Sequence, residues 1–377
     1  MRALVVLTQP PLVEGGAPGR CAVALIRGLR SHGVEVEALA ARHPFAVAGD
    51  PPADLQVEVV PVDPPSPGWR GRPGRLRRPR GDLVQGELVE RVRAAAARAD
   101  VVHLEETETS WADEGVSTPS LVHIQYLVRR DRSLPAPWTQ AFRDYVELAL
   151  AERAAIRRHR WIVASSPLVA DAIRSVAAHA RVVVAPLSLD PAHYSPALLQ
   201  DPPVAGVIGT AAWPPTARAM SRLLERDWPR IRAAAPAARL LVAGRGTERF
   251  RTLDPRPGAE IVGEVPSGAS FLRDLSVLLY PIDRGSGMKV KVLEAIATGL
   301  PVVTTSPGAE GIAPNDGVVV ANSEREFVER SVSILLDPEE RRERGRVARA
   351  TFERLYSPGP ATEPLVELYT RMIESRD

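Results

Sequence analysis

The chain has 377 residues, 45% of them hydrophobic, so it is long enough for two globular domains rather than one. Its formal net charge of +2 and its lack of a recognisable nucleic-acid-binding motif argue against DNA or RNA as a partner. A single cysteine, Cys21, excludes an internal disulfide and is typical of a reducing compartment. No apolar run approaches the ~20 residues of a membrane-spanning helix. We therefore expect a cytoplasmic protein, at most peripheral to the inner membrane face.

Short apolar runs of β type alternate with helical stretches along the whole chain. This alternation predicts the α/β class, with two doubly wound, Rossmann-like domains of parallel strands. The predicted strands of the first half cover residues 3–7, 34–39, 57–60, 101–104, 120–124, 161–164 and 182–185. Those of the second half cover residues 204–210, 239–242, 260–262, 277–280, 302–304 and 318–320. The main predicted helices cover residues 20–31, 83–98, 138–158, 338–356 and 362–375.

Proline content marks the boundary between the two halves. Five prolines between residues 186 and 203 exclude a continuous helix or a central strand there. We predict an N-terminal domain over 1–187, a proline-rich linker over 188–203 and a C-terminal domain over 204–357. A Ser-Pro-Gly-Pro break precedes the last helix, and we expect residues 358–377 to pack back on the N-terminal domain.

An insertion rich in arginine, residues 61–81, interrupts the regular pattern. One interpretation is a solvated loop. The other is a contact for an anionic acceptor or for membrane headgroups through residues 69–80.

Only two lysines occur in the chain, Lys289 and Lys291, and both lie in the stretch from Asp283 to Ala295. Gly285, Ser286 and Gly287 precede a predicted helix whose first turn would carry the ammonium groups. Exposed backbone N–H groups and a positive charge at a helix N-terminus form a site for an anion, and lysine suits phosphate.

Other residues could complete such a site. Gly15 and Gly16 follow the first strand and precede a helix, although an ordinary turn would look the same. Glu294 lies beside an apolar stripe and needs hydrogen bonds there, either from ribose hydroxyls or from Lys291. Gly244 and Gly246 end a strand as an incomplete nicotinamide fingerprint, and we expect a nucleotide to lie near Gly244 and Arg245.

Residues 285–295, with 298–303 and Gly308-Ala309-Glu310-Gly311, resemble the donor-site signature of the GT4 family of retaining glycosyltransferases. The Gly15-Gly16 loop and Trp213-Pro214-Pro215 resemble the same family, so the resemblance covers nearly the whole chain. It implies the GT-B fold, in which two Rossmann-like domains face each other across a cleft. The N-terminal domain would bind the acceptor, and the C-terminal domain would bind the nucleotide-sugar donor.

The resemblance also implies roles for individual residues. Glu294 would bind the donor ribose, Lys289 would neutralise the diphosphate, and His123 would contact the transferred sugar. His123 and Lys289 are therefore the expected catalytic residues. The expected donor contacts are Gly15, Gly16, Gly244, Arg245, Val265, Arg284, Ser286, Gly287, Met288, Lys289 and Glu294.

The expected reaction moves a sugar from a nucleoside diphosphate, a UDP-sugar being slightly favoured, to a hydroxyl of a small-molecule, natural-product or lipid or cell-wall acceptor. Neither a metal nor a cofactor is expected, because dipoles and lysine can neutralise the leaving group. The chain departs from many members at Ser286, where they carry a glutamate, and after residue 210, where they carry an Arg/Lys pair. Two alternatives thus remain open: a nucleotide-sugar epimerase or hydrolase, and an inactive nucleotide-sugar-binding partner. An inverting enzyme would need a base such as Glu105, Glu106 or Asp131.

Overall fold

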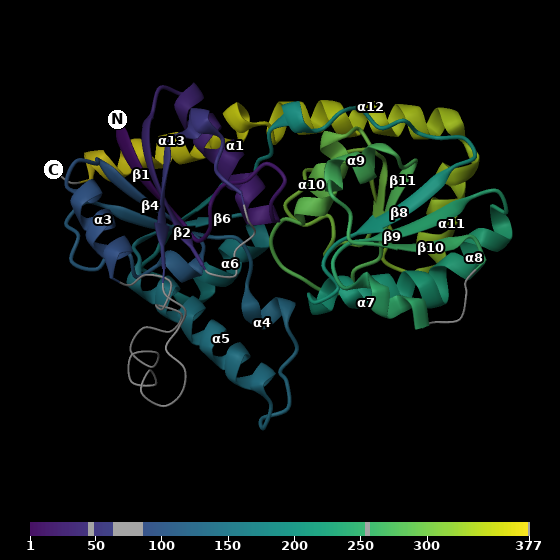
Figure 1. Ribbon diagram of the computed structural model, residues 1–377, viewed down its shortest axis with the longest axis horizontal. Helices are drawn as coiled ribbons and strands as arrows, with labels where there is room; N and C mark the ends of the chain where they lie inside the picture. Colours follow the sequence, from purple (N-terminus) through teal and green to yellow (C-terminus); the bar gives the residue numbers. More distant parts are fainter. Residues whose placement is uncertain (44–48, 63–85, 253–256, 376–377) are drawn as a thin grey trace. The chain divides into compact units, whose positions relative to one another are not determined.

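The computed structural model describes residues 1–43, 49–62, 86–252 and 257–375. The predicted membrane contact at 69–80 lies outside the described residues, as does nearly all of the 61–81 insertion. Two compact units are present, and the chain passes between them twice. Unit 1 comprises Met1–Ser188 and Pro358–Asp377, and unit 2 comprises Leu189–Ser357 (Figure 1).

Unit 1 contains a parallel sheet of seven strands in the order β3-β2-β1-β4-β5-β6-β7. Its strands are β1 Arg2–Leu7, β2 Glu35–Arg42, β3 Val57–Pro61, β4 Val101–Glu105, β5 Ser120–Ile124, β6 Trp161–Ala164 and β7 Arg181–Val184. Each contains one of the predicted runs or overlaps it closely. Because helices cover both faces of this sheet, its strands are short and mainly apolar rather than alternating.

The helices of unit 1 come from both ends of the chain. They are α1 Ala17–Ser31, α3 Glu87–Ala96, α4 Val128–Asp131, α5 Gln140–Arg158, α6 Pro167–Val176 and α13 Pro358–Glu374. Helix α13 begins four residues earlier than predicted, since proline is tolerated in a first helical turn. It packs against α1, and its Leu365, Leu368 and Met372 share one apolar cluster with β1.

Unit 2 contains a second parallel sheet, of six strands in the order β10-β9-β8-β11-β12-β13. Its strands are β8 Val204–Ile208, β9 Arg239–Ala243, β10 Ala259–Gly263, β11 Val277–Tyr280, β12 Val302–Thr304 and β13 Val318–Val320. Its helices are α7 Pro214–Arg222, α8 Trp228–Ala234, α9 Gly268–Arg273, α10 Val290–Ala297, α11 Glu324–Leu336 and α12 Pro338–Leu355, with a π-helical segment at Leu223–Asp227. Two parallel sheets of this kind confirm the predicted α/β class.

Residues 189–203, within the predicted linker, pack against unit 2. The Ala197 N–H donates to the Thr298 carbonyl at 2.7 Å, and the Leu198 N–H donates to the Arg273 carbonyl at 2.8 Å. Tyr194 is 3% exposed. These contacts explain why the boundary of unit 2 falls at Leu189.

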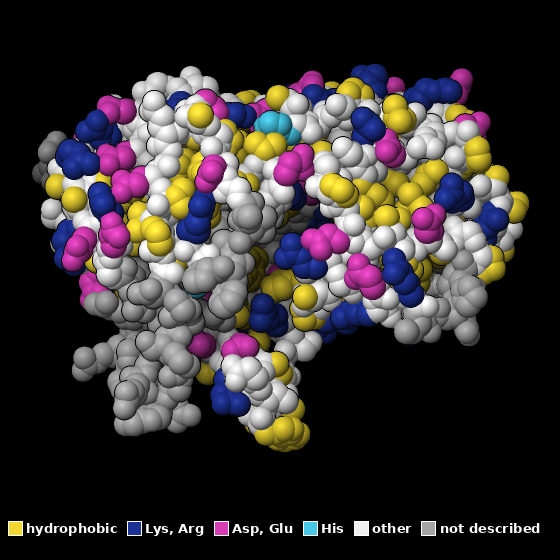
Figure 2. Space-filling model, viewed as in Figure 1, with side chains coloured by type: hydrophobic (Ala, Val, Ile, Leu, Met, Phe, Trp, Pro, Cys, Tyr) yellow, Lys and Arg dark blue, Asp and Glu magenta, His cyan; other side chains and the backbone are white. Residues whose placement is uncertain are grey.

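Charges of both signs are interspersed over the face of the protein that Figure 2 shows. This distribution agrees with the nearly balanced composition, because arginines and carboxylates form many surface pairs. Within the described part of the chain, every helix is too short or too polar to span a bilayer.

Candidate functional site

Each sheet has a switch point, where the connections leave the first strand of that unit in opposite directions. In unit 1 the switch point lies between β1 and β4, and in unit 2 it lies between β8 and β11. Ligands of open parallel sheets bind outside the carboxyl ends of the strands at such points. The side chains at these two switch points are therefore the candidates for a ligand site.

Lys291 marks the switch point of unit 2. Its Nζ donates to Thr216 Oγ1 at 2.9 Å and to Tyr280 Oη at 3.2 Å. A methyl group added to Gly209, directly after β8, would lie 3.1 Å from this Nζ. The resemblance implied a diphosphate contact for Lys289 and assigned no individual role to Lys291. The structure makes it the ammonium group beside the end of β8.

Lys289 has a different environment. Helix α10 begins at Val290 rather than near Ser286, and Lys289 is its N-cap residue. The Lys289 Nζ donates to the carbonyls of Ser286 at 3.0 Å and Gly287 at 2.6 Å. Lys289 thus bridges the Gly-Ser-Gly loop that precedes its own helix.

The glycine loop contains the other predicted phosphate contacts. Ser286 and Met288 are 2% and 6% exposed, and Gly287 has a φ of 69°, which favours glycine. The Gly287 N–H donates to Glu310 Oε1 at 3.0 Å. A phosphate that bound this N–H would have to replace the Glu310 carboxylate.

Glu294 lies on α10 and is 6% exposed, as its place beside an apolar stripe predicted. One hydrogen bond reaches its Oε1 from Tyr194 Oη, at 3.1 Å. The predicted alternative partner, Lys291, instead bonds Thr216 and Tyr280. Glu294 is therefore a buried carboxyl that accepts a hydroxyl hydrogen bond, the type of contact that ribose also offers.

The remaining predicted donor residues of unit 2 lie at the same carboxyl edge of the sheet. Gly244 has a φ of 120°, and a methyl group there would lie 2.1 Å from the Gly209 carbonyl oxygen, so packing alone requires glycine. Arg245 forms an exposed ion pair with Glu264 at 3.1 Å. Val265 follows β10 and is half-buried, and Arg284 is exposed.

A cavity of about 550 Å³ lies in unit 2 along α7 and its π-helical extension. Charges of both signs line it, including Arg222, Arg226, Asp283 and Glu324. None of the predicted donor residues contributes to it. Its lining nevertheless includes Pro281 and Asp283, which directly follow β11, so the cavity adjoins the switch point, which remains the candidate site.

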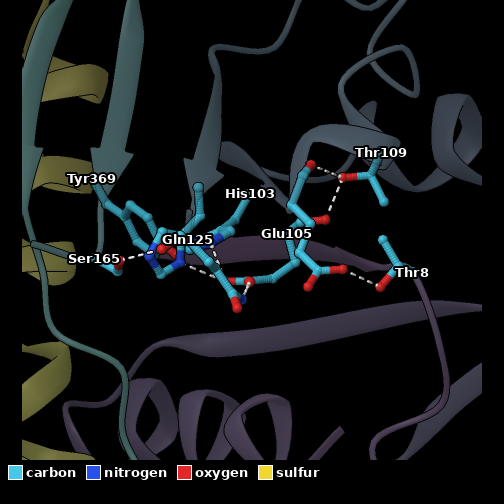
Figure 3. A network of polar contacts seen from close by, with 9 residues as sticks. Thr8, His103, Glu105, Thr109, Gln125, Ser165 and Tyr369 are labelled. Atoms are coloured by element: carbon cyan, nitrogen blue, oxygen red, sulfur yellow. Dashed lines mark hydrogen bonds and ion pairs between the residues drawn. The ribbon is translucent and has the colours of Figure 1, made fainter. Parts of the chain in front are cut away.

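The switch point of unit 1 contains a buried polar network (Figure 3). Glu105, the last residue of β4, is opposite His123 of β5 in the register of the sheet. Its Oε1 accepts hydrogen bonds from His123 Nδ1 at 2.8 Å and from His103 Nε2 at 3.0 Å. Its Oε2 accepts a hydrogen bond from Gln125 Nε2 at 2.8 Å. The predicted sugar contact, His123, is thus part of a larger network that the sequence analysis did not predict.

These hydrogen bonds decide the charge of Glu105. Burial alone would raise the pKa of this carboxyl, but its interactions with His123 and His103 hold that pKa well below the ordinary value. Burial lowers the pKa of His103, which is fully buried and therefore neutral. Glu105 is a buried carboxylate that three N–H donors stabilise.

The next residue, Glu106, has the opposite character. Its φ of 67° and ψ of 163° lie in a region that is essentially restricted to glycine. Its Oε2 accepts a hydrogen bond from Thr8 Oγ1 at 2.7 Å. Burial, followed by the nearby Glu108, raises the pKa of Glu106 to about 8, so this carboxyl is protonated at neutral pH. The sequence analysis named it only as a base for an inverting reaction.

A cavity of about 10 Å³ lies at this switch point, lined by Thr8, Gln9, Pro18, Glu105, Glu106 and Gln125. This volume holds about one water-sized group. Gly15 and Gly16 lie at the start of α1 nearby in the chain, with Gly16 as the N-cap. A methyl group on Gly16 would meet no atom closer than 3.8 Å, so packing alone does not require this glycine.

The ligand-capable atoms of His103, Glu105 and His123 lie within 4.8 Å of one another, close enough to surround a cation. The same atoms already bond each other through N–H donors on both histidines. Hydrogen bonding therefore accounts for this cluster without a cation.

Comparison with known proteins supports this assignment of the fold. Residues 202–337, which include the whole switch point of unit 2, match the family model of glycosyl transferases group 1. A search of curated proteins gives no significant match.

Several solved structures are similar over nearly the whole chain. HepE of Anabaena, solved with UDP and glucose, is 13% identical with a TM-score of 0.64, and the match covers 98% of this chain and 99% of HepE. WaaG, a glycosyltransferase of lipopolysaccharide biosynthesis, is 14% identical with a TM-score of 0.64 and 99% of each chain covered. AviGT4, of avilamycin A biosynthesis, is 19% identical with a TM-score of 0.57, and 99% of this chain and 98% of AviGT4 are covered. The fold is that of the GT-B glycosyltransferases.

Proposed function

We propose that this chain is a retaining, GT4-type glycosyltransferase. It transfers a sugar from a nucleoside diphosphate to a hydroxyl of a small-molecule, natural-product or lipid acceptor. The observation that carries this proposal is the group 1 glycosyl transferase match over residues 202–337, because the same segment contains Lys291 and Glu294. UDP is the favoured nucleotide, since HepE, which has the same fold, was solved with UDP and with UDP-glucose.

In this proposal the carboxyl edge of the unit 2 sheet binds the donor. Glu294 accepts hydrogen bonds from the ribose hydroxyls, in place of or beside the Tyr194 hydroxyl. Lys291 lies at the diphosphate, where a compact ammonium group suits phosphate oxygens. Lys289 keeps the glycine loop in shape through the Ser286 and Gly287 carbonyls, so that backbone N–H groups can bind phosphate.

The reaction itself needs stabilisation of a leaving group. The bond between the anomeric carbon and the donor phosphate oxygen breaks, and the nucleoside diphosphate leaves with the electron pair. The acceptor oxygen forms the new bond on the same face, and its proton passes to the departing phosphate oxygen. Lys291 and the loop dipoles neutralise the developing charge, so the proposal requires no metal.

A binding panel tests the donor site first. UDP, GDP, dTDP and ADP are added separately to the wild type, to Glu294→Ala and to Glu329→Ala, whose carboxylate is 65% exposed on α11. We expect one nucleotide to raise the melting temperature of the wild type and of the Glu329 variant but not of the Glu294 variant. No shift with any nucleotide would contradict the donor site, whereas binding without transfer to any acceptor would favour an inactive nucleotide-sugar-binding partner.

Product analysis tests the reaction. The sugar conjugate of the nucleotide that binds is incubated with hydroxyl acceptors, with and without EDTA, and the anomeric configuration of the product is read by NMR. Retention that persists in EDTA is expected. An inverted product, or turnover that EDTA abolishes, would overturn the mechanism, and donor consumption without any acceptor would indicate a hydrolase or epimerase.

A further inference from the structure

The buried network of unit 1 joins two distant parts of the chain. His103 and Glu105 are two residues apart on β4 and therefore share one face of the sheet. Tyr369 of α13 is fully buried against that face, and its Oη lies 2.5 Å from His103 Nδ1. A continuous chain of hydrogen bonds thus runs from the C-terminal helix through His103 and Glu105 to His123 (Figure 3).

The proton positions in this chain follow from the chemistry of its members. An ionised carboxylate only accepts hydrogen bonds, so His103 Nε2 and His123 Nδ1 must both carry protons. His103 is neutral, and its Nδ1 is therefore a lone pair that accepts the Tyr369 O–H proton. Each contact then has one donor and one acceptor, as a buried polar network requires.

His123 keeps one atom outside this network. The residue is 3% exposed, and its Nε2 has no hydrogen-bond partner among the described residues. A buried polar atom without a partner is costly, which indicates that this atom meets a ligand. Because Nδ1 of His123 donates its proton to Glu105, Nε2 is the ring nitrogen that remains available to bind a ligand.

We propose that Glu105 is a positioning residue that accepts a hydrogen bond from the Nδ1 proton of His123, so that Nε2 of the same ring binds a hydroxyl of the transferred sugar. Tyr369 in turn orients His103 by a hydrogen bond, and His103 orients Glu105. This inference rests on the proposed function and on the sugar contact that the resemblance to the GT4 family implies for His123. It makes helix α13 part of the polar network of unit 1, although Tyr369 lies 246 residues after His123 in the chain (369 − 123).

Spectroscopy tests the proton positions without any substrate. The full-length protein is labelled with ¹⁵N-histidine, and the seven histidines are resolved by long-range ¹H–¹⁵N spectra, with His123→Gln assigning the key signals. We expect His123 to carry its proton on Nδ1 in the wild type. In Glu105→Gln a neutral amide oxygen, which is a weaker acceptor than a carboxylate, replaces the atom that His123 Nδ1 contacts, so we expect part of His123 to shift towards the Nε2–H tautomer. A wild-type His123 with Nδ1 unprotonated, or an unchanged spectrum in Glu105→Gln, would overturn the proposal.

Kinetics test the consequence for the reaction. Loss of one oriented hydrogen bond to the sugar should lower kcat about 10- to 100-fold in Glu105→Gln. UDP should still shift the melting temperature of this variant, because Glu105 is not among the predicted contacts of the nucleotide. Full activity in Glu105→Gln would contradict the positioning role. Absence of UDP binding to every variant, wild type included, would instead contradict the proposed function and leave the tautomer result standing.

The chain offers a matched control and a milder variant. Asp113 is a second buried carboxylate of unit 1 that faces a histidine, His159, at 3.3 Å. Asp113→Asn should leave the His123 signals and kcat unchanged. Tyr369→Phe keeps the ring and removes one hydroxyl, so it should fold and change the His103 Nδ1 signal. An unchanged His103 signal in this variant would remove Tyr369 from the network.

Discussion

The raised pKa of Glu106 predicts a pH dependence of stability that can be measured without any substrate. Its pKa is raised to about 8, first by burial and then by Glu108, and its Oε2 accepts a hydrogen bond from Thr8. The folded protein therefore holds a proton on Glu106 at pH values where the unfolded chain, with a carboxyl pKa of about 4.3, has lost it. Stability from this proton is fully present below pH ~4 and is lost as the pH rises through about 8.

The perturbation is Glu106→Gln, which keeps the shape of the side chain and removes its titration. One proton bound only by the folded state gives a slope of at most about −1.4 kcal/mol per pH unit in the free energy of unfolding. Between pH 5 and 8 the wild type should lose about 2–4 kcal/mol relative to the variant, because solvent that still reaches this half-buried residue reduces the effect. Titrating groups that do not interact with Glu106 are common to both proteins and cancel in the difference.

The assay follows unit 1 directly. Hydrogen exchange of the β4 amides, measured by mass spectrometry at pH 5, 6, 7 and 8, gives the opening free energy of that strand in both proteins. Comparison at equal pH removes the intrinsic exchange rate. A difference between wild type and Glu106→Gln that stays constant from pH 5 to 8 would refute the reasoning, and so would a wild type that gains stability as the pH rises.

Three further predictions concern single positions. Lys291→Met should lower kcat about 10²- to 10³-fold, as expected for loss of one preorganised charge at the leaving group, whereas Lys289→Met should mainly lower the melting temperature. Gly16→Ala should leave the melting temperature unchanged, because its methyl group has space, yet weaken donor binding about tenfold, which titration with the nucleotide measures. Gly28→Ala should destabilise unit 1 by about 1–3 kcal/mol, because its methyl group would lie 2.3 Å from the Pro358 carbonyl oxygen; denaturant unfolding measures this.

Each of these predictions has a result that contradicts it. Equal turnover of Lys291→Met and wild type would show that Lys291 does not neutralise the leaving phosphate. A larger loss of kcat in Lys289→Met than in Lys291→Met would support the catalytic role that the motif predicted for Lys289. Full nucleotide affinity in Gly16→Ala would exclude the α1 loop from the donor site. Unchanged unfolding of Gly28→Ala would show that α1 and α13 separate at no cost.

The sequence by itself determined the two parallel sheets. Every strand of the structure coincides with a short apolar run between helical stretches, because a strand buried on both faces must be apolar along its length. The glycine-rich stretch before Glu294 likewise indicated an anion site and gave the resemblance to the GT4 family. Such signals are local, since each depends on residues within one element or one loop.

Only the tertiary structure decided which side chains meet. Lys289 and Lys291 are two residues apart, yet the first bends back to its own loop while the second reaches Thr216, which is 75 residues away. Tyr369 and His103 are separated by 266 residues, and no pattern within β4 or α13 predicts their contact. Local periodicity reports whether a position is buried, whereas the partner of a buried polar group depends on strand order and on where the last helix packs.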